Sequence, residues 1–261
     1  MGILNVTPDS FSDGGVHLDA GAAIQSAMAM VEAGADMLDV GGESTRPGAA
    51  PLPMEEELRR VEPVIAAIAS RVPVPISIDT YKAGVAERAL ELGASIVNDI
   101  SAFAYDPELA AVAARRKAGV ILMHNRGRSA NMYEFATYTD VVEEIGRELT
   151  ARAELAIAAG VAREAIVLDP GFGFAKRAEH SMEALARLAG FHAFGYPILS
   201  GPSRKSFLQI GLGQRPPAGR VWGSAAAVAA SVLAGAHIVR VHDVAAMADV
   251  VRVADAINSV A

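Results

Sequence analysis

The chain has 261 residues, of which 52% are apolar, and its 23 Lys and Arg against 30 Asp and Glu leave a net charge of −7. This apolar content excludes an intrinsically disordered chain. The absence of cysteine excludes disulfides, thiolate metal sites and a cysteine nucleophile. The acidic balance argues against nucleic acid as a partner, because nucleic-acid binding depends on a dense positive field. We therefore expect small-molecule partners, and a cytoplasmic location fits the lack of cysteine.

Neither the N-terminus nor the one long uncharged stretch predicts membrane association. Residues 1–9 lack the basic and apolar regions of a signal peptide. Residues 221–239 form a 19-residue stretch without formal charge, close to the ~20 residues that cross a bilayer. Because this stretch is mostly Ala, Gly and Ser, we predict a buried helix that runs into a short strand instead of a membrane span.

Short apolar runs suited to buried strands alternate with amphipathic segments suited to helices. The predicted strands are 2–6, 37–40, 75–79, 95–98, 119–123, 165–169, 197–200 and 237–241. The predicted helices are 19–33, 54–70, 82–92, 107–117, 139–159, 179–190, 220–235 and 243–258. Pro63 is expected to kink or restart the second helix.

Eight β-then-α units without a linker predict a parallel sheet covered by helices. At this length the pattern favours an α/β protein with a (β/α)8 TIM barrel in a single domain, residues 1–261. A doubly wound open sheet is the alternative. The first strand is short, because Met1 opens within it, which predicts a strand truncated at its N-terminus.

Almost every predicted strand ends in a hydrogen-bonding side chain. These are Asn5, Asp39, Asp79, Asn98, His124, Asp169, the turn 200–205, and the pair Arg240 and His242. A single Asp at a strand end is usually a cap or turn former. In a barrel, however, the carboxyl ends of the strands converge on one pocket. The set therefore predicts a binding site at that end of the barrel.

The residue types in this set select a class of ligand. Asp79, Asn98 and Asp169 match the edge of a flat aminopyrimidinone, and Lys205 offers a donor to its carbonyl. Arg240 and His242 alternate along one strand and lie on the same side of it. With Arg46 they form a set of cations suited to phosphate oxygens.

Two polar, turn-rich loops, 5–15 and 41–53, are candidate lids.

The remaining side chains of note predict no chemistry of their own. Trp222 is expected in the core, and Arg126 and Arg128 as loop charges in solvent. Surface or packing roles are expected for His17, His180, His192 and His237. The Gly171 and Gly173 pair fits either a tight turn or a phosphate cradle.

Seven motifs occur in order: NVTPDSFSDGG, DVGGESTRPG, IDT, VNDI, DPGFGF, GPSRKSF and RVHD. With them the chain resembles the bacterial dihydropteroate synthases from Met1 to about Asn258. The resemblance implies a transferase of folate synthesis and a sulfonamide target. Such an enzyme joins 6-hydroxymethyl-7,8-dihydropterin diphosphate to 4-aminobenzoate and releases diphosphate and 7,8-dihydropteroate.

The resemblance also implies roles for individual residues. The pterin diphosphate would contact Thr45, Asp79, Asn98, Met123, Asp169, Phe174, Gly201, Lys205, Arg240, Val241 and His242. The aminobenzoate would contact Phe11, Arg46, Pro47, Phe172, Lys205 and Ser206. Asn5 would contact the cofactor, Mg²⁺, and a homodimer through the outer helices is expected.

The expected mechanism is SN1-like, with Asp79, Asp169, Lys205, Arg240 and His242 as the catalytic residues. Arg240 and His242, both as cations, would stabilise the leaving diphosphate, and the two carboxylates would stabilise the pterin cation. Asp13 and Asp39 would order the loops and balance charge.

Three other functions compete with this one. A pterin-binding methyltransferase would share the Asp79, Asn98 and Asp169 set but would have less use for the cations. A non-catalytic pterin binder would use the loops for retention alone. A phosphosugar isomerase of the same fold lacks an evident Glu and His base pair at the strand ends.

Overall fold

The computed structural model describes residues 1–7, 16–45 and 48–260. Its parallel strands are β1 (Gly2–Asn5), β2 (Leu38–Gly41), β3 (Ile76–Asp79), β4 (Ile96–Asp99), β5 (Gly119–Met123), β6 (Ile166–Asp169), β7 (Leu199–Ser200) and β8 (Ile238–Val239). Every predicted strand is present, and its ends lie within two residues of the prediction.

A helix follows each strand. The long helices are α1 (Val16–Glu32), α2 (Met54–Ile68), α3 (Ala83–Glu91), α4 (Glu108–Arg115), α5 (Val141–Ala158), α6 (Ala178–Ala186), α8 (Val221–Leu233) and α9 (Val244–Asn258), and α7 (Gln209–Leu212) is a short addition. Pro63 lies inside α2 without restarting it. Within the described residues no helix is both long and apolar enough to cross a bilayer, and residues 221–239 fold as α8 followed by β8, as predicted.

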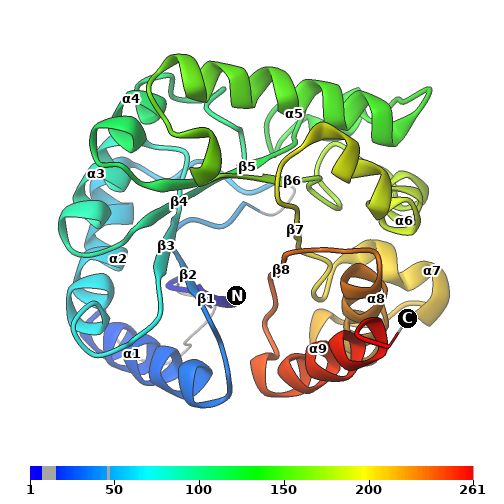
Figure 1. The fold of residues 1–261 in the computed structure, drawn as a ribbon. Coiled ribbons are helices and arrows are strands. Elements are labelled where there is room, and N and C mark those ends of the chain that lie inside the picture. The colour runs from blue at the N-terminus through cyan, green and yellow to red at the C-terminus, as the bar shows by residue number, and fades with distance from the viewer. Residues whose placement is uncertain (8–15, 46–47, 261) are drawn as a thin grey trace.

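The strands form a closed barrel. Strands β1 to β6 make one sheet and β7 and β8 a second. Two parallel bridges, Gly2 to Val241 and Leu168 to Ile198, join the two sheets at both edges. Figure 1 shows the strands in the centre with the helices around them. The TIM barrel is therefore confirmed over the open sheet, and the short first strand does not prevent closure.

The two faces of each strand enter different cores. Outward side chains, such as Leu38, Ile78 and Leu168, belong to the main core with residues of the surrounding helices. Inward side chains, such as Ile121 and Leu199, form a separate apolar cluster inside the barrel. Because side chains alternate along a strand, the next inward positions lie two residues further on. These positions form the carboxyl-terminal mouth of the barrel.

Candidate active site

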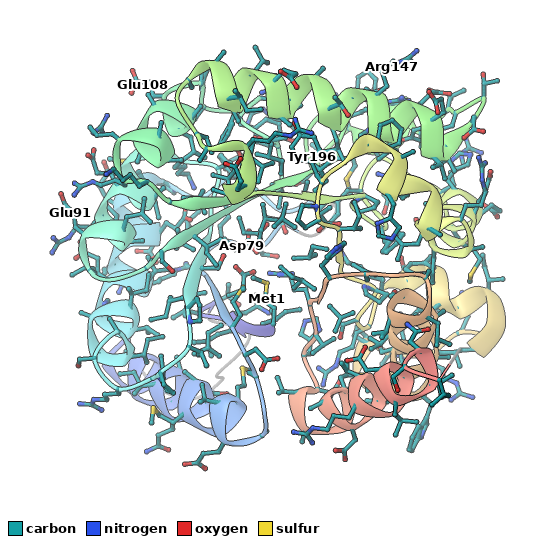
Figure 2. The ribbon with its side chains drawn as sticks, in the orientation of Figure 1. Met1, Asp79, Glu91, Glu108, Arg147 and Tyr196 are labelled. Carbon is teal, nitrogen blue, oxygen red and sulfur yellow. The ribbon has the colours of Figure 1, made fainter. Side chains whose placement is uncertain are left out.

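Four inward positions of neighbouring strands lie in one row at the mouth. The strand register pairs Asn5 with Gly41, Gly41 with Asp79, and Asp79 with Asn98. On the far side, Asp169 pairs with Met123. Figure 2 shows the side chain of Asp79 within the ring of strands. The structure thus brings together polar residues, from Asn5 to Asp169, that lie up to 164 positions apart in the sequence.

Arg240 connects two carboxylates at this mouth. Its Nε donates to Asp39 Oδ2 at 2.6 Å and its Nη2 donates to Asp79 Oδ2 at 2.7 Å. Burial raises the pKa of Asp79 to about 7, with Arg240 opposing this rise and Asp39 adding to it. Burial also opposes the charge of Arg240, but Asp39 and Asp79 keep the pKa of its guanidinium above the ordinary value. Arg240 therefore remains a cation, whereas Asp79 titrates near neutrality.

Asp169 is held by the turn that follows β6. Its Oδ1 accepts a hydrogen bond from the Gly171 backbone N–H at 2.7 Å. Gly171 has a φ of +70°, and a Cβ there would lie 2.2 Å from the carbonyl oxygen of His124. Only glycine fits this turn. Because the Gly171 N–H already binds Asp169, the tight-turn interpretation is favoured over the phosphate cradle.

Lys205 lies over an aromatic wall. Its Nζ is 4.1 Å from the ring centre of Phe174, and Phe174 shares a small apolar cluster with Met123 and Ile100. Burial and the nearby Arg240 lower the pKa of Lys205 to about 8, although Asp169 opposes this change. A cationic donor beside a flat apolar surface suits a planar heterocycle with a carbonyl group.

His242 differs from the cation that we expect from the sequence. Its Nδ1 lies 3.0 Å from Ser203 Oγ, and the same hydroxyl oxygen accepts from the His242 backbone N–H at 3.1 Å. Burial, together with Arg240 and Arg204, lowers the pKa of His242 to about 4. The imidazole is therefore neutral at neutral pH in this structure, whereas the sequence leads us to expect a second cation beside Arg240.

Two residues expected at the substrates also have contacts that hold the fold together. Val241 is 4% exposed, and its backbone N–H and C=O bind Met1 and Ile3 to close the barrel. Phe172 is 1% exposed and packs against Phe207, with ring centres 5.7 Å apart. Both side chains are buried in this structure, and their expected contacts with the substrates stay predictions.

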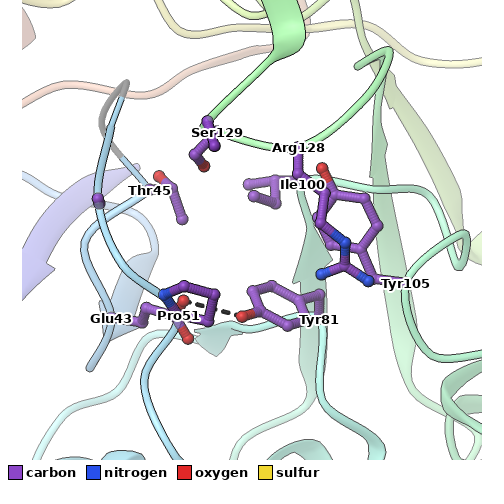
Figure 3. Close-up of a pocket in the computed structure, with 10 residues that line it drawn as sticks. Glu43, Thr45, Pro51, Tyr81, Ile100, Tyr105, Arg128 and Ser129 are labelled. Carbon is purple, nitrogen blue, oxygen red and sulfur yellow. Dashed lines mark hydrogen bonds between the residues drawn. The ribbon is translucent and has the colours of Figure 1, made fainter.

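The other residues expected at the substrates lie at the rim or outside the described part of the chain. Ser206 is exposed and directly follows Lys205, and Gly201 follows β7. Thr45 lines a cavity with Tyr81, Tyr105 and Arg128 (Figure 3). Phe11, Asp13, Arg46 and Pro47 lie outside the described residues.

Hydrogen bonds anchor both sides of the loop that follows β2. Arg60 Nη1 donates to the carbonyl oxygen of Gly42 at 2.9 Å, and Tyr81 Oη donates to Glu43 at 2.8 Å (Figure 3). Beyond the gap in the description, the Gly48 N–H donates to the Ser129 carbonyl at 3.1 Å. The described parts of this candidate lid are thus tied to the barrel.

Comparison with known proteins agrees with this geometry. Residues 1–242 match the family of pterin binding enzymes. A dihydropteroate synthase of Synechocystis is 49% identical over 257 residues, which cover 98% of this chain and 89% of that protein. The chain belongs to the dihydropteroate synthase family. It is a transferase of folate synthesis.

Solved structures of the family have the same fold. A Yersinia pestis dihydropteroate synthase with a bound sulfonamide drug has a TM-score of 0.93 and 44% identity, covering 99% of this chain and 94% of that chain. A Xanthomonas albilineans dihydropteroate synthase in complex with 7,8-dihydropteroate has a TM-score of 0.90 and 40% identity, covering 99% and 93%.

A buried network beside the mouth was not predicted from the sequence. The ring of His124 lies 3.0 Å from Glu148 of α5 through Nε2 and 2.8 Å from Lys176 Nζ through Nδ1. Lys176 Nζ also donates to the Phe174 carbonyl at 2.9 Å. Burial lowers the pKa of Lys176 well below its ordinary value and that of His124 to about 4. His124 therefore joins the loops after β5 and β6, and its place in the predicted ring is wrong.

No local sequence signal marks this network, because Lys176 resembles an ordinary charge before a helix. Arg126 belongs to the same region, where it pairs with Glu144 and Glu148, so its expected place in solvent is wrong.

The packing role of His180, His192 and His237 is confirmed by their contacts with aromatic rings, while His17 has no described side chain. The predicted burial of Trp222 is wrong, because this side chain is 79% exposed.

Proposed function

We propose that the mouth of the barrel is where the pterin diphosphate and 4-aminobenzoate react. The observation that supports this is the meeting of Asp79 and Asp169, which end β3 and β6, with Arg240, which directly follows β8. Asp79, Asn98 and Asp169 would accept from the ring N–H and amine donors of the pterin. Lys205 would donate to its carbonyl while Met123 and Phe174 contact the ring face.

The same residues would promote a dissociative reaction. Departure of diphosphate would leave a cation at the pterin methylene, delocalised into the ring. The buried carboxylates of Asp79 and Asp169 would stabilise this cation more than the neutral substrate, because their charge is poorly solvated. The weakly basic arylamine would then attack without a dedicated general base. Asp79, whose pKa is near 7, would be ionised most fully as the positive charge develops.

Arg240 and His242 would bind the leaving diphosphate in different ways. Arg240 contributes a positive charge. His242 would contribute a neutral N–H in the tautomer in which Nδ1 accepts from the Ser203 hydroxyl and Nε2 carries the proton. Diphosphate bound at this N–H would raise the pKa of His242.

We also propose Mg²⁺ as the cofactor, with Asn5 as its protein ligand. Asn5 offers an amide oxygen in the same row as Asp79. Among the described residues no group of three acidic or histidine side chains could hold a metal alone. This fits Mg²⁺, which usually binds one or two protein oxygens together with substrate phosphates and water. Bound there, the ion would neutralise charge on the diphosphate.

The direct test is to incubate the chain with both substrates and measure pteroate and diphosphate formation with and without Mg²⁺. We expect both products in equal amounts, and only when the metal is present. Diphosphate release without pteroate would contradict the condensation. Pterin binding without turnover would favour a binding protein, and methyl transfer from a folate would favour a methyltransferase.

We propose that the chain forms a homodimer through α7, α8 and α9. Large apolar side chains are exposed on these helices, namely Ile210, Trp222, Leu233, Val253 and Ile257. Such a patch favours burial against a second copy. Light scattering should give a dimer mass for the natural chain and a monomer mass for Trp222→Glu, whereas Leu155→Glu on the opposite helix α5 should remain dimeric.

Two further expectations accompany this function. We propose a cytoplasmic location, which the absence of cysteine supports. We also propose that sulfonamides compete with aminobenzoate, since the Yersinia pestis relative binds such a drug. Competitive inhibition kinetics with varied aminobenzoate would test this.

A further inference from the structure

Asp39 binds the Asn98 and Arg240 side chains, so it balances the charge of Arg240 as expected from the sequence. Its expected role in ordering the loops stays a prediction, because residues 8–15 and 46–47 lie outside the described part of the chain. Asp39 lies in β2, two residues before Gly41, and therefore one layer deeper than the row that contains Asp79 and Asn98. Its side chain is 0% exposed. The Asp39 carboxylate thus has no exposed atom at the mouth in this structure, and its Oδ2 is bound by the Arg240 and Asn98 side chains.

One oxygen of Asp39 organises two residues of the mouth. Oδ2 accepts from Asn98 Nδ2 at 3.0 Å and from Arg240 Nε at 2.6 Å. The first bond determines the amide orientation of Asn98, so that its carbonyl oxygen is left to accept from a ligand. The second bond, together with that from Arg240 Nη2 to Asp79, fixes the plane of the guanidinium.

The other oxygen of Asp39 has no hydrogen-bond partner within the described part of the chain. Among the described residues, Asp39 Oδ1 is buried without a hydrogen-bond partner, and Ser77 Oγ beside it in the register is in the same state. Buried polar atoms without partners destabilise a fold, and an apolar side chain at such a position is often better for stability. We infer that the acceptor oxygen at this buried position serves to hold its two neighbours.

We propose that Asp39 is a positioning residue of the pterin site, which orients the Asn98 amide and the Arg240 guanidinium through a single carboxylate oxygen. This inference rests on the proposed role of Asn98 and Arg240 in pterin binding. Asp39 itself does not contact substrate. It strengthens pterin binding because a side chain that is already oriented loses less conformational entropy when the ligand binds.

Three substitutions at Asp39 separate position from charge. Asp39→Ala removes the acceptor, and we expect the affinity for 6-hydroxymethylpterin, measured by titration calorimetry, to fall about 10- to 100-fold. Asp39→Asn can place its carbonyl oxygen at the Oδ2 position and its amine at the unpartnered Oδ1, and should recover most of that affinity. Asp39→Glu keeps the charge but displaces the oxygen, and should remain weak.

Kinetics and a matched control distinguish positioning from a general loss of structure. In Asp39→Ala we expect a raised KM for the pterin diphosphate and a KM for aminobenzoate within about two-fold of the natural value. Ser77→Ala changes a buried side chain of the same layer and should bind the pterin normally. Equal losses in Ser77→Ala and Asp39→Ala, or equal rises in both KM values, would overturn the proposal.

A thermodynamic cycle that ends in a triple mutant tests whether Asp39 acts through Asn98 and Arg240. If Asp39 acts through Asn98 and Arg240, adding Asp39→Ala to the Asn98→Ala, Arg240→Ala pair should lower pterin affinity little further. The role of Asp39 would be refuted if adding Asp39→Ala lowered the pterin affinity of the Asn98→Ala, Arg240→Ala variant by the same factor as in the natural chain. Natural pterin affinity in both Asp39→Ala and Asp39→Glu would refute it as well. If Asn98→Ala and Arg240→Ala alone bind normally, the proposed pterin site itself fails.

Discussion

The buried carboxylate of Asp79 should reduce the stability of the protein in exchange for function. We predict that Asp79→Asn is more stable than the natural chain at pH 8 but binds pterin poorly. The side chain of Asp79 is only 14% exposed. Burial raises its pKa from 3.8 to about 7, even though Arg240 opposes the rise. A neutral asparagine has no charge to desolvate.

The sign and size follow from proton linkage. Between about pH 4 and 7 the folded state holds a proton on Asp79 that the unfolded state has lost, so the free energy of unfolding falls as pH rises through this window. The pKa of Asp79 rises by about 3, from 3.8 to about 7, and each pKa unit is worth about 1.36 kcal/mol. The ionised carboxylate therefore lowers the free energy of unfolding above pH 7 by at most roughly 4 kcal/mol. Asp79→Asn also loses the charged contact with Arg240, which lowers its stability. The change with pH in the difference between the two unfolding free energies is therefore the quantity to measure.

Urea denaturation of both proteins at pH 5, 6, 7 and 8 measures that part. The difference in unfolding free energy should shift in favour of Asp79→Asn as the pH rises, mostly between pH 5 and 7. Glu87→Gln is the control, because this carboxyl on α3 binds Arg115 and its pKa is lowered. The free energy of unfolding of Glu87→Gln at pH 8 should be no higher than that of the natural chain. A difference between Asp79→Asn and the natural chain that is the same at every pH would refute the reasoning.

Three other substitutions have defined outcomes. Asp169→Ala should weaken titration-calorimetric binding of a pterin analogue about 10- to 100-fold, because a buried acceptor is lost; natural affinity would exclude its role. Arg240→Ala should lower diphosphate capture and kcat together, and a near-normal rate with normal Mg²⁺ dependence would count against the assignment. Lys176→Met should lower the thermal midpoint by several degrees, since His124 and Phe174 lose a buried donor. Below pH 10.5 the unfolded state keeps a proton on Lys176 that the folded state binds weakly. As the pH rises through the alkaline range, the free energy of unfolding of the natural chain should therefore increase, whereas that of Lys176→Met should lack this increase.

The sequence by itself determined the barrel and the residue types at its mouth. Strands, helices and their order follow from hydrophobic period, which is a local property, and every predicted strand is present. Polar residues at strand ends, such as Asp79 and Asp169, could be placed at one mouth because parallel strands end on the same side.

Contacts between distant residues were decided only by the tertiary structure. The bond from Arg240 to Asp39 joins positions 201 residues apart, and that from Lys176 to His124 joins positions 52 apart. Which way a side chain such as His124 or Phe172 turns depends on the space that neighbouring elements leave, and the pKa of His242 depends on its burial. These properties arise when packing removes water and brings charges together, so no local pattern in the chain encodes them.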